Sequence, residues 1–163
     1  MLLNKEQVIK VLPHRDPFLF IDTVEYVKLP EGKEGKKLVY TKELPGTEVK
    51  AHFKVPEDLV ILKGHFPGNP ILPGVVQCEM MAQASAFVCL AFDFDLNAGG
   101  VETLLLGVDN SRFRKPIVPN MELEIYTKVT KVRGTFAQYE SYIMSGGEKI
   151  SECTFMATLK MKG

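Results

Sequence analysis

The chain has 163 residues, and its 20 Lys and Arg are balanced by 20 Asp and Glu, which gives a formal net charge of zero at neutral pH. This length suits one domain with its own core, so the sequence predicts a single domain over residues 1–163. The charge balance argues against a nucleic-acid-binding or anionic-membrane protein, because such proteins usually carry a basic excess. The hydrophobic share of 45% and the charged share of 25% are typical of globular chains, which excludes disorder.

The cysteines and the N-terminus indicate the compartment. Three cysteines, Cys78, Cys89 and Cys153, make an odd number without CxxC spacing, so neither a disulfide framework nor a zinc site is expected. No apolar signal-peptide region follows Met1. The apolar stretch 73–92 contains a carboxylate and several amides, which favour a buried core helix over a membrane span. The sequence therefore predicts a cytoplasmic protein.

The first half of the chain contains a short helix, three candidate strands and an irregular loop. A capping-box pattern from Asn4 to Gln7 predicts a helix that ends before Pro13. Residues rich in β-branched and aromatic side chains predict strands over 18–29, 38–44 and 47–55, with a charged loop over 30–37. Three Pro and three Gly within 64–74 predict a loop of fixed shape.

The second half contains one long helix followed by strands. The helix is predicted from residue 73 or 74 to Phe92, since proline is common at a helix start. Four further strands are predicted over 102–110, 121–133, 135–145 and 149–160. Helices do not recur between these strands, so the order favours an α+β fold in which an antiparallel sheet wraps around the central helix.

Glu79 is the only formally charged residue between Gly64 and Phe92. The predicted helix is therefore apolar on every face, as expected for a buried helix. No Lys or Arg lies within four residues of Glu79, and burial of an unpaired carboxylate is unfavourable. Glu79 is either a functional acid or a structural residue that pairs with a distant Arg or reaches solvent. Gln83, one turn later on the same face, could orient this carboxylate by hydrogen bonding.

His65 lies fourteen residues before Glu79, in the loop rich in proline and glycine. A histidine can accept and return a proton near neutral pH, although a lone loop histidine is usually only solvated. Paired with Glu79, it suits removal of a proton beside a carbonyl together with protonation of a leaving group. Gly74 at the helix start would offer free amides to a thioester carbonyl oxygen, and it is equally consistent with a glycine that only permits the turn.

Four segments carry a resemblance to a known family: LPHRDPFL at 12–19, GHFPGNPILPGV at 64–75, EMMAQ at 79–83 and RFRKP at 112–116. In this order they resemble the 3-hydroxyacyl-[acyl carrier protein] dehydratases of fatty-acid biosynthesis, over about residues 10–160. The resemblance implies a hot-dog fold. It also implies a hydro-lyase that converts a (3R)-3-hydroxyacyl thioester on acyl carrier protein into the trans-2-enoyl product.

The resemblance also assigns roles to the candidate residues. His65 matches the catalytic histidine, Glu79 the catalytic acid, and Gly74 the position whose amide polarises the thioester carbonyl. The histidine and the acid of one site would come from opposite subunits of a homodimer, which often assembles further as a trimer of dimers. No metal or organic cofactor is expected. Glu79, in place of an Asp, favours the branch that dehydrates without isomerising.

Arg112, Arg114 and Lys115 place three positive charges within four residues. Acyl carrier protein is acidic, so the resemblance favours a docking role for them, while the alternative is an ordinary solvated strand end. Asp16 departs from the aromatic or apolar residue often found in the family, and the charged loop 30–37 is longer than expected. His14 is expected only to order the N-terminal segment.

Two other functions stay open. A hot-dog acyl thioesterase would use a helix carboxylate to activate water and would release a free thiol. A non-catalytic homologue that binds acyl carrier protein, in a specialised lipid or polyketide pathway, would not need both His65 and Glu79. The sequence leaves the acyl chain length open, because tunnel depth depends on how residues such as Phe87, Leu90 and Phe92 pack.

Overall fold

The structure is a computed structural model that describes residues 1–97 and 100–161. Six strands form one antiparallel sheet in the order β1-β2-β5-β6-β7-β4, and β3 pairs with β8 in a separate two-stranded ribbon. In chain order the elements are α1 (Lys5–Val11), β1 (Thr23–Lys28), η1 (Thr41–Glu43), β2 (Glu48–Lys54), η2 (Val60–Lys63), α2 (Gly74–Ser85), η3 (Ala86–Ala91), β3 (Val101–Glu102), β4 (Leu105–Phe113), β5 (Glu122–Arg133), β6 (Phe136–Ser145), β7 (Glu148–Thr158) and β8 (Lys160–Met161).

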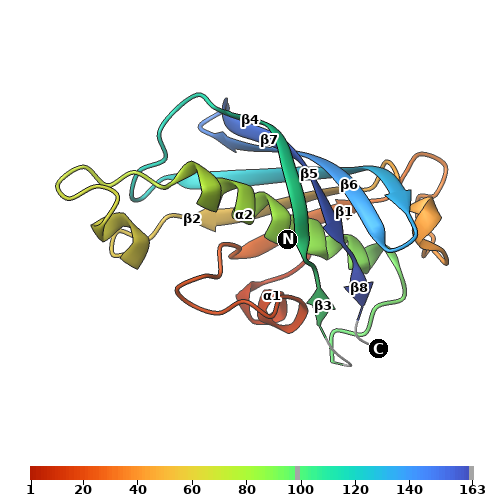
Figure 1. The fold of residues 1–163 in the computed structure, drawn as a ribbon. Helices are drawn as coiled ribbons and strands as arrows, with labels where there is room; N and C mark the ends of the chain where they lie inside the picture. Colours follow the sequence, from red (N-terminus) through yellow and green to blue (C-terminus); the bar gives the residue numbers. More distant parts are fainter. Residues whose placement is uncertain (98–99, 162–163) are drawn as a thin grey trace.

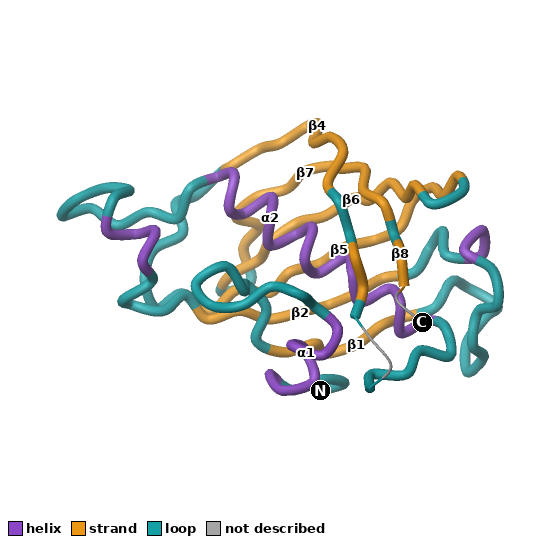
Figure 2. The backbone as a smooth tube through the Cα atoms, turned by 60° about the horizontal axis from the view of Figure 1, so that its bottom comes forward, coloured by secondary structure: helices purple, strands orange, loops and turns teal. Residues whose placement is uncertain are grey.

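The helix α2 forms the centre of the fold, and the sheet wraps around it (Figures 1 and 2). It contacts β2, β4, β5, β6 and β7, so most of the sheet covers one helix. Nine of its twelve residues are buried: Val76, Gln77, Cys78, Met80, Met81, Ala82, Gln83, Ala84 and Ser85. The predicted buried helix and the predicted sheet around it are confirmed.

Alternation along the strands closes the core over α2. On β2 the inward side chains are Val49, Ala51 and Phe53, all buried, while the residues between them are partly exposed. The long strands β5, β6 and β7 repeat this period of two, which places one side chain in every pair against the helix. Cys89 lies in this core, and burial raises the pKa of its thiol to about 12.

The α-helix ends at Ser85, earlier than the expected end at Phe92. The hydroxyl of Ser85 donates a hydrogen bond to the carbonyl of Ala82 over 2.7 Å. From Ala86 to Ala91 the chain continues as the tighter 3₁₀-helix η3. The stretch Gly74–Ala91 is long and apolar enough to cross a membrane, but 78% of it is buried inside the fold, as in the core helix of a globular protein.

The first strand expected near the N-terminus begins later than predicted. The strand predicted over 18–29 begins only at Thr23, because the backbone of Phe18 and Phe20 hydrogen-bonds to the side chain of Gln83 instead of to a strand. The helix expected before Pro13 is confirmed, and both hydrogen bonds of its capping box are present.

The strand predicted over 38–44 is wrong. This segment is a loop that contains the short turn η1. Glu43 accepts hydrogen bonds from the amides of Val39 and Tyr40, at 3.0 and 2.9 Å, and these bonds hold the chain in a turn. Lys33 donates to the same carboxylate over 2.7 Å and, with the two amides, lowers the pKa of Glu43 to about 2.

The strand predicted over 102–110 divides into two. Val101–Glu102 pairs with the C-terminal ribbon, and β4 then runs from Leu105 to Phe113 along the edge of the main sheet. Eight of the nine β4 residues are exposed, and large apolar side chains lie among them and next to them: Leu104, Leu105, Leu106, Val108 and Phe113. An edge strand with so much exposed apolar surface usually pairs with another chain.

Truncation of Phe87 tests whether the sheet depends on the central helical segment. Phe87 in η3 is fully buried, so Phe87→Ala should lower the free energy of unfolding by about 3–5 kcal/mol through lost burial and a residual cavity. Chemical denaturation followed by circular dichroism measures this change. Phe136→Ala is the matched control, because Phe136 is 47% exposed. An equal loss for both variants would contradict the central role of the segment.

Candidate active site

The carboxylate of Glu79 is held at the middle of α2 by two side chains. Gln83 Nε2 donates a hydrogen bond to Glu79 Oε1 over 2.9 Å, as the sequence predicts. His14 Nε2 lies 3.3 Å from the same oxygen. The Glu79 side chain is 23% exposed, so the carboxylate opens onto solvent within an otherwise buried helix face.

Gln83 itself is oriented by the backbone. Its Oε1 accepts the amide of Phe20 over 2.9 Å, and its Nε2 also donates to the carbonyl of Phe18 over 3.0 Å. Because Oε1 accepts an N–H, the amide group can only present Nε2 to Glu79. Gln83 Nε2 therefore donates to Glu79 Oε1, and the His14 ring lies beside the same oxygen. Among the described residues no hydrogen bond to Glu79 Oε2 is present.

A small cavity of about 90 Å³ lies beside Glu79 and has a mixed polar and apolar lining. Its lining residues are Leu12, Pro13, His14, Glu79, Ala82, Gln83, Ala86, Val101, Thr103 and Leu105. The segment around His14 and the first residues of β4 therefore form one wall, and α2 forms the other. A cavity this small leaves room beside the carboxylate for only a small group.

His65 is fixed by two hydrogen bonds to one residue. Its Nδ1 lies 2.7 Å from the carbonyl of Ile71, and the amide of Ile71 donates to the carbonyl of His65 over 2.8 Å. A carbonyl can only accept, so Nδ1 carries the hydrogen, and Nε2 of the neutral ring keeps its lone pair. The ring stacks on Phe66 with the centroids 4.0 Å apart. The predicted loop of fixed shape thus presents a proton acceptor.

Gly74 begins α2 beside this histidine. Pro73 gives the helix no side-chain cap, and its carbonyl accepts the amides of Val76 and Gln77. The amides of Gly74 and Val75 therefore have no intrahelical acceptor and carry partial positive charge. A Cβ at position 74 would lie 2.9 Å from Cζ of Phe113, closer than side chains pack. A side chain at position 74 would therefore require the Phe113 ring to shift, a constraint that the sequence alone does not show.

His65 and Gly74 share a second cavity, of about 310 Å³. It is lined by His65, Ile71, Leu72, Gly74, Gln77, Phe113, Arg114, Lys115 and Pro116. Two of the three basic residues predicted for docking thus lie next to the histidine. Glu79 does not line this cavity, and His65 does not line the cavity beside Glu79. One chain therefore holds the histidine and the acid in separate places.

Ion pairs leave the three basic residues unequal. Arg114 lies 2.7 Å from Glu152, and Lys115 pairs with Glu148. Arg114 and then Lys149 lower the pKa of Glu152 to about 2. Among the described residues no carboxylate lies within 4 Å of the Arg112 guanidinium, so no neighbour offsets the positive charge of Arg112 at the surface.

The chain is similar to known proteins over most of its length. The family model ApeI-like, described as ApeI dehydratase, matches residues 41–152. The 3-hydroxyacyl-[acyl-carrier-protein] dehydratase FabZ of Desulforamulus reducens is 33% identical over 161 residues, which cover 99% of this chain and 100% of that protein. That of Anaeromyxobacter sp. (strain Fw109-5) is 31% identical and covers 97% of this chain and 90% of its own length. The chain belongs to the 3-hydroxyacyl-[acyl-carrier-protein] dehydratase family.

Solved structures agree with this dehydratase family in fold. The dehydratase heterocomplex ApeI:P from Xenorhabdus doucetiae has a TM-score of 0.66 at 19% identity, covering 99% of this chain and 94% of that one. A hot-dog-like protein from Thermanaerovibrio acidaminovorans has a TM-score of 0.57 at 13% identity, covering 75% and 88%. These likenesses show the hot-dog fold and confirm the predicted α+β class.

Two contacts of the candidate site were not predicted from the sequence. His14 was expected only to order the N-terminal segment, yet it lies against Glu79. Its place in the segment LPHR was the available signal. Phe113, which packs on Gly74, lies between the basic residues and gave no separate signal.

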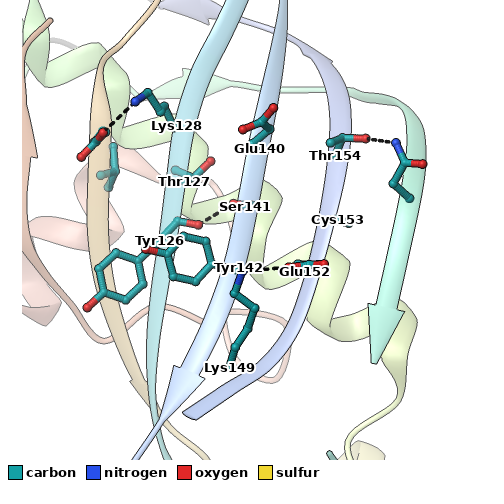
Figure 3. A pocket seen from close by; sticks show the side chains of 13 residues that line it. Tyr126, Thr127, Lys128, Glu140, Ser141, Tyr142, Lys149, Glu152, Cys153 and Thr154 are labelled. Carbon is teal, nitrogen blue, oxygen red and sulfur yellow. Dashed lines mark hydrogen bonds and ion pairs between the residues drawn. The ribbon is translucent and has the colours of Figure 1, made fainter. Parts of the chain in front are cut away.

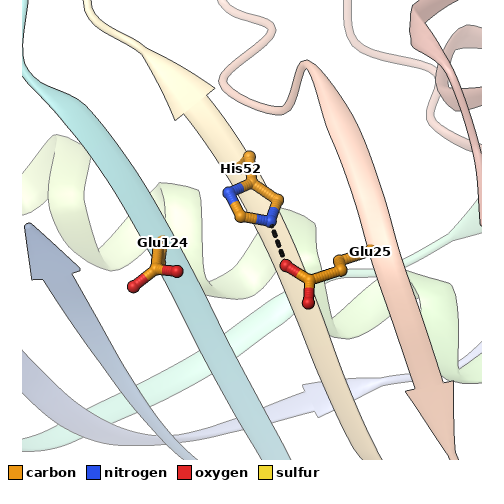
Figure 4. Close-up of side chains that lie close together, drawn as sticks. All are labelled: Glu25, His52 and Glu124. Atoms are coloured by element: carbon orange, nitrogen blue, oxygen red, sulfur yellow. Dashed lines mark hydrogen bonds and ion pairs between the residues drawn. The ribbon is translucent and has the colours of Figure 1, made fainter. Parts of the chain in front are cut away.

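A group of possible metal ligands lies on the outer face of the sheet, away from the dehydratase site (Figure 4). Ligand atoms of Glu25, His52 and Glu124 lie within 4.8 Å of one another. The ammonium of Lys50 lies 2.9 Å from Glu25 and 2.8 Å from Glu124, where a cation would bind. Lys50 and then His52 lower the pKa of Glu25. This cluster is an ion-pair network that ties β1, β2 and β5 together.

A further cavity, of about 390 Å³, also opens on the outer face (Figure 3). Its wall contains Tyr126 stacked on Tyr142 with the ring centroids 4.7 Å apart, and Lys149 lies 4.8 Å from the Tyr142 centroid. None of the candidate catalytic residues lines it.

Substitution of Gly74 tests the close approach of β4 to the start of α2. In Gly74→Ala the added methyl must displace Phe113 or the helix start, so turnover of a hydroxyacyl thioester should fall by about 10–100-fold. Gly64→Ala is the control, since a methyl there meets nothing within 4 Å. Partial recovery in Gly74→Ala/Phe113→Leu would assign the loss to the ring. An unchanged rate in Gly74→Ala would contradict the assignment.

Proposed function

We propose that this protein dehydrates (3R)-3-hydroxyacyl-acyl carrier protein to the trans-2-enoyl product in fatty-acid biosynthesis. The observation that carries the proposal is a histidine whose Nδ1 is held by a carbonyl, so that Nε2 stays free beside the open start of a helix. The relatives named as 3-hydroxyacyl-[acyl-carrier-protein] dehydratases, and the family model named for a dehydratase, support it.

The reaction follows from the free atoms of the site. His65 Nε2 removes the proton from C2 of the substrate, and negative charge develops on the thioester oxygen. The amide of Gly74 stabilises that charge, because it is a preorganised donor at a helix N-terminus. Protonated Glu79 donates its proton from Oε2 to the C3 hydroxyl, which leaves as water while the C2–C3 double bond forms. Gln83 and His14 hold Oε1 and so keep Oε2 directed at the substrate.

Each complete site would use two copies of the chain. Because His65 and Glu79 line different cavities of one chain, His65 of one copy would face Glu79 of the other. The exposed apolar edge strand β4 fits such a contact, since it forms part of both cavities and leaves its outer hydrogen-bonding groups free. We propose a homodimer joined through β4, in which two sites are formed at once. A trimer of dimers would be a further level of assembly.

Two features restrict the reaction and its location. Glu79, where the isomerising branch of the family has Asp, favours dehydration alone. We also propose that the enzyme is cytoplasmic and that residues 1–163 form one hot-dog domain. It would use neither a metal nor an organic cofactor. A thioesterase remains the competing activity, and release of free thiol from the same substrate would reveal it.

Paired variants test both the chemistry and the shared site. His65→Ala and Glu79→Gln should each lower dehydration of 3-hydroxyacyl-acyl carrier protein by about 10²–10⁴-fold, because each loses one proton-transfer group. Formation of the enoyl thioester is followed by mass spectrometry. If His65→Ala turned over normally, the catalytic assignment would fail.

The two inactive variants are then unfolded and refolded together in equal amounts. Random pairing puts half of the chains in mixed dimers, each with one intact site, so the mixture should recover about a quarter of the wild-type activity. Each variant refolded alone is the control and should stay inactive. No recovery, with mixed dimers confirmed by native mass spectrometry, would contradict a site shared between subunits.

The basic residues give a separate prediction about docking. Arg112 is the residue without a neutralising carboxylate, so Arg112→Glu should raise the KM for acyl carrier protein substrates about tenfold at low salt. The effect should shrink above about 0.5 M salt, where the charges are screened. A short pantetheine thioester should show no change. Lys131→Glu, an exposed charge reversal on β5, is the control, and an equal effect there would contradict docking at Arg112.

A further inference from the structure

A groove of about 560 Å³ lies at the β1 edge of the sheet. It is formed by the N-terminal residues, the end of β1, the loop 30–37 and the chain on both sides of the end of η3. Its lining residues are Leu2, Leu3, Gln7, Val27, Leu29, Gly35, Lys36, Lys37, Leu90, Ala91, Phe94 and Leu96. The charged loop that departs from the expected family pattern thus forms one side of it.

The groove has an apolar floor that folding leaves partly uncovered. Five apolar side chains pack against the core but are only partly buried: Val27, Leu29, Leu90, Phe94 and Leu96. Leu2 is 47% exposed beside them. Partly uncovered apolar side chains from three separate segments of the chain make a concave surface, as in sites for small apolar ligands.

Charge in the groove has one sign. Lys36 and Lys37 are its charged lining residues, and no carboxylate lines it, although the whole chain has equal numbers of acids and bases. Lys37 Nζ donates to the carbonyl of Leu90 over 2.9 Å, which fixes this ammonium at the end of η3. Lys36 is exposed and has no carboxylate within 4 Å among the described residues. The rim therefore attracts an anion next to an apolar floor.

The groove is separate from the candidate active site. None of His14, His65, Gly74, Glu79 or Gln83 lines it. β1 and β4 form opposite edges of the sheet, so a dimer joined through β4 leaves the β1 edge uncovered. A ligand here would not compete directly with a substrate thioester.

We infer that this groove binds the free carboxylate of a long-chain fatty acid. The alkyl chain would lie on Leu29, Leu90 and Phe94, and the carboxylate would pair with Lys36 and Lys37. The rim selects an anionic head group over a cationic or neutral one, and the floor selects an alkyl chain over a short polar anion. This inference does not rest on the dehydratase activity, because it concerns binding at another place.

Isothermal titration calorimetry of the full chain with dodecanoate, below its micelle concentration, tests the inference. One dodecanoate should bind per chain with a Kd on the order of 10 μM. Dodecyltrimethylammonium, which has the same chain and the opposite charge, should bind at least about tenfold more weakly. Equal affinity for both amphiphiles would overturn the role of the lysine rim.

Variants locate the site. Leu29→Glu places a carboxylate on the floor, and Lys36→Glu reverses the charge of the rim, so each should weaken dodecanoate binding about tenfold or more. Lys131→Glu should bind as the wild type does. If Leu29→Glu kept full affinity while circular dichroism showed native structure, the ligand would lie elsewhere and the inference would fail.

Leu29→Glu and Lys36→Glu should dehydrate substrate at the wild-type rate, because neither residue lies at the candidate active site. Weaker dodecanoate binding with an unchanged dehydration rate would therefore be assigned to the groove and not to damage at the catalytic site. The alternative is that a second copy of the chain covers the groove. Light scattering would then show larger assemblies, Leu29→Glu would separate them, and dodecanoate would not bind. That result would also overturn the inference.

Discussion

The side-chain amide of Gln83 allows a carboxylate to exist on a helix that the sheet encloses. It bonds Glu79 and, at the same time, the backbone of Phe18 and Phe20, so all of its strong hydrogen-bonding positions are directed by the fold. A buried polar group without hydrogen-bond partners would lower the stability of the fold by about 1–3 kcal/mol. The N-terminal segment is therefore drawn against α2, and with it comes His14, the second residue at the carboxylate.

The sheet is left open at its β4 edge. β1 at the other end is packed against the N-terminal segment through Leu3, whereas β4 presents apolar side chains to solvent. The same strand contributes Leu105 to the cavity beside Glu79 and Phe113 to the cavity beside His65. A contact at β4 would therefore change the surroundings of both catalytic candidates, which links assembly of the protein to its chemistry.

Most of the architecture could be predicted from the sequence, because strand alternation and the charge-free helix are local patterns. The long strands β5, β6 and β7 and the start of α2 agree with prediction. The segment 38–44 could not be predicted, since its turn depends on Glu43 meeting Lys33 and nearby amides in three dimensions. Motifs identified His65, Glu79 and Gln83, and the family resemblance anticipated that His65 and Glu79 of one chain lie apart, but only the folded chain shows which residues line the cavity beside each of them.

The contact between Gly74 and Phe113 has a consequence for how such a site can diverge. The helix start lacks room for a methyl only because an aromatic ring from β4 occupies that space. A side chain at position 74 therefore requires either that the Phe113 ring moves aside or that position 113 becomes smaller. The two residues, 39 positions apart in the sequence, are expected to be inherited as a pair, and a smaller residue at 113 would also widen the path along which a substrate meets the first amides of α2.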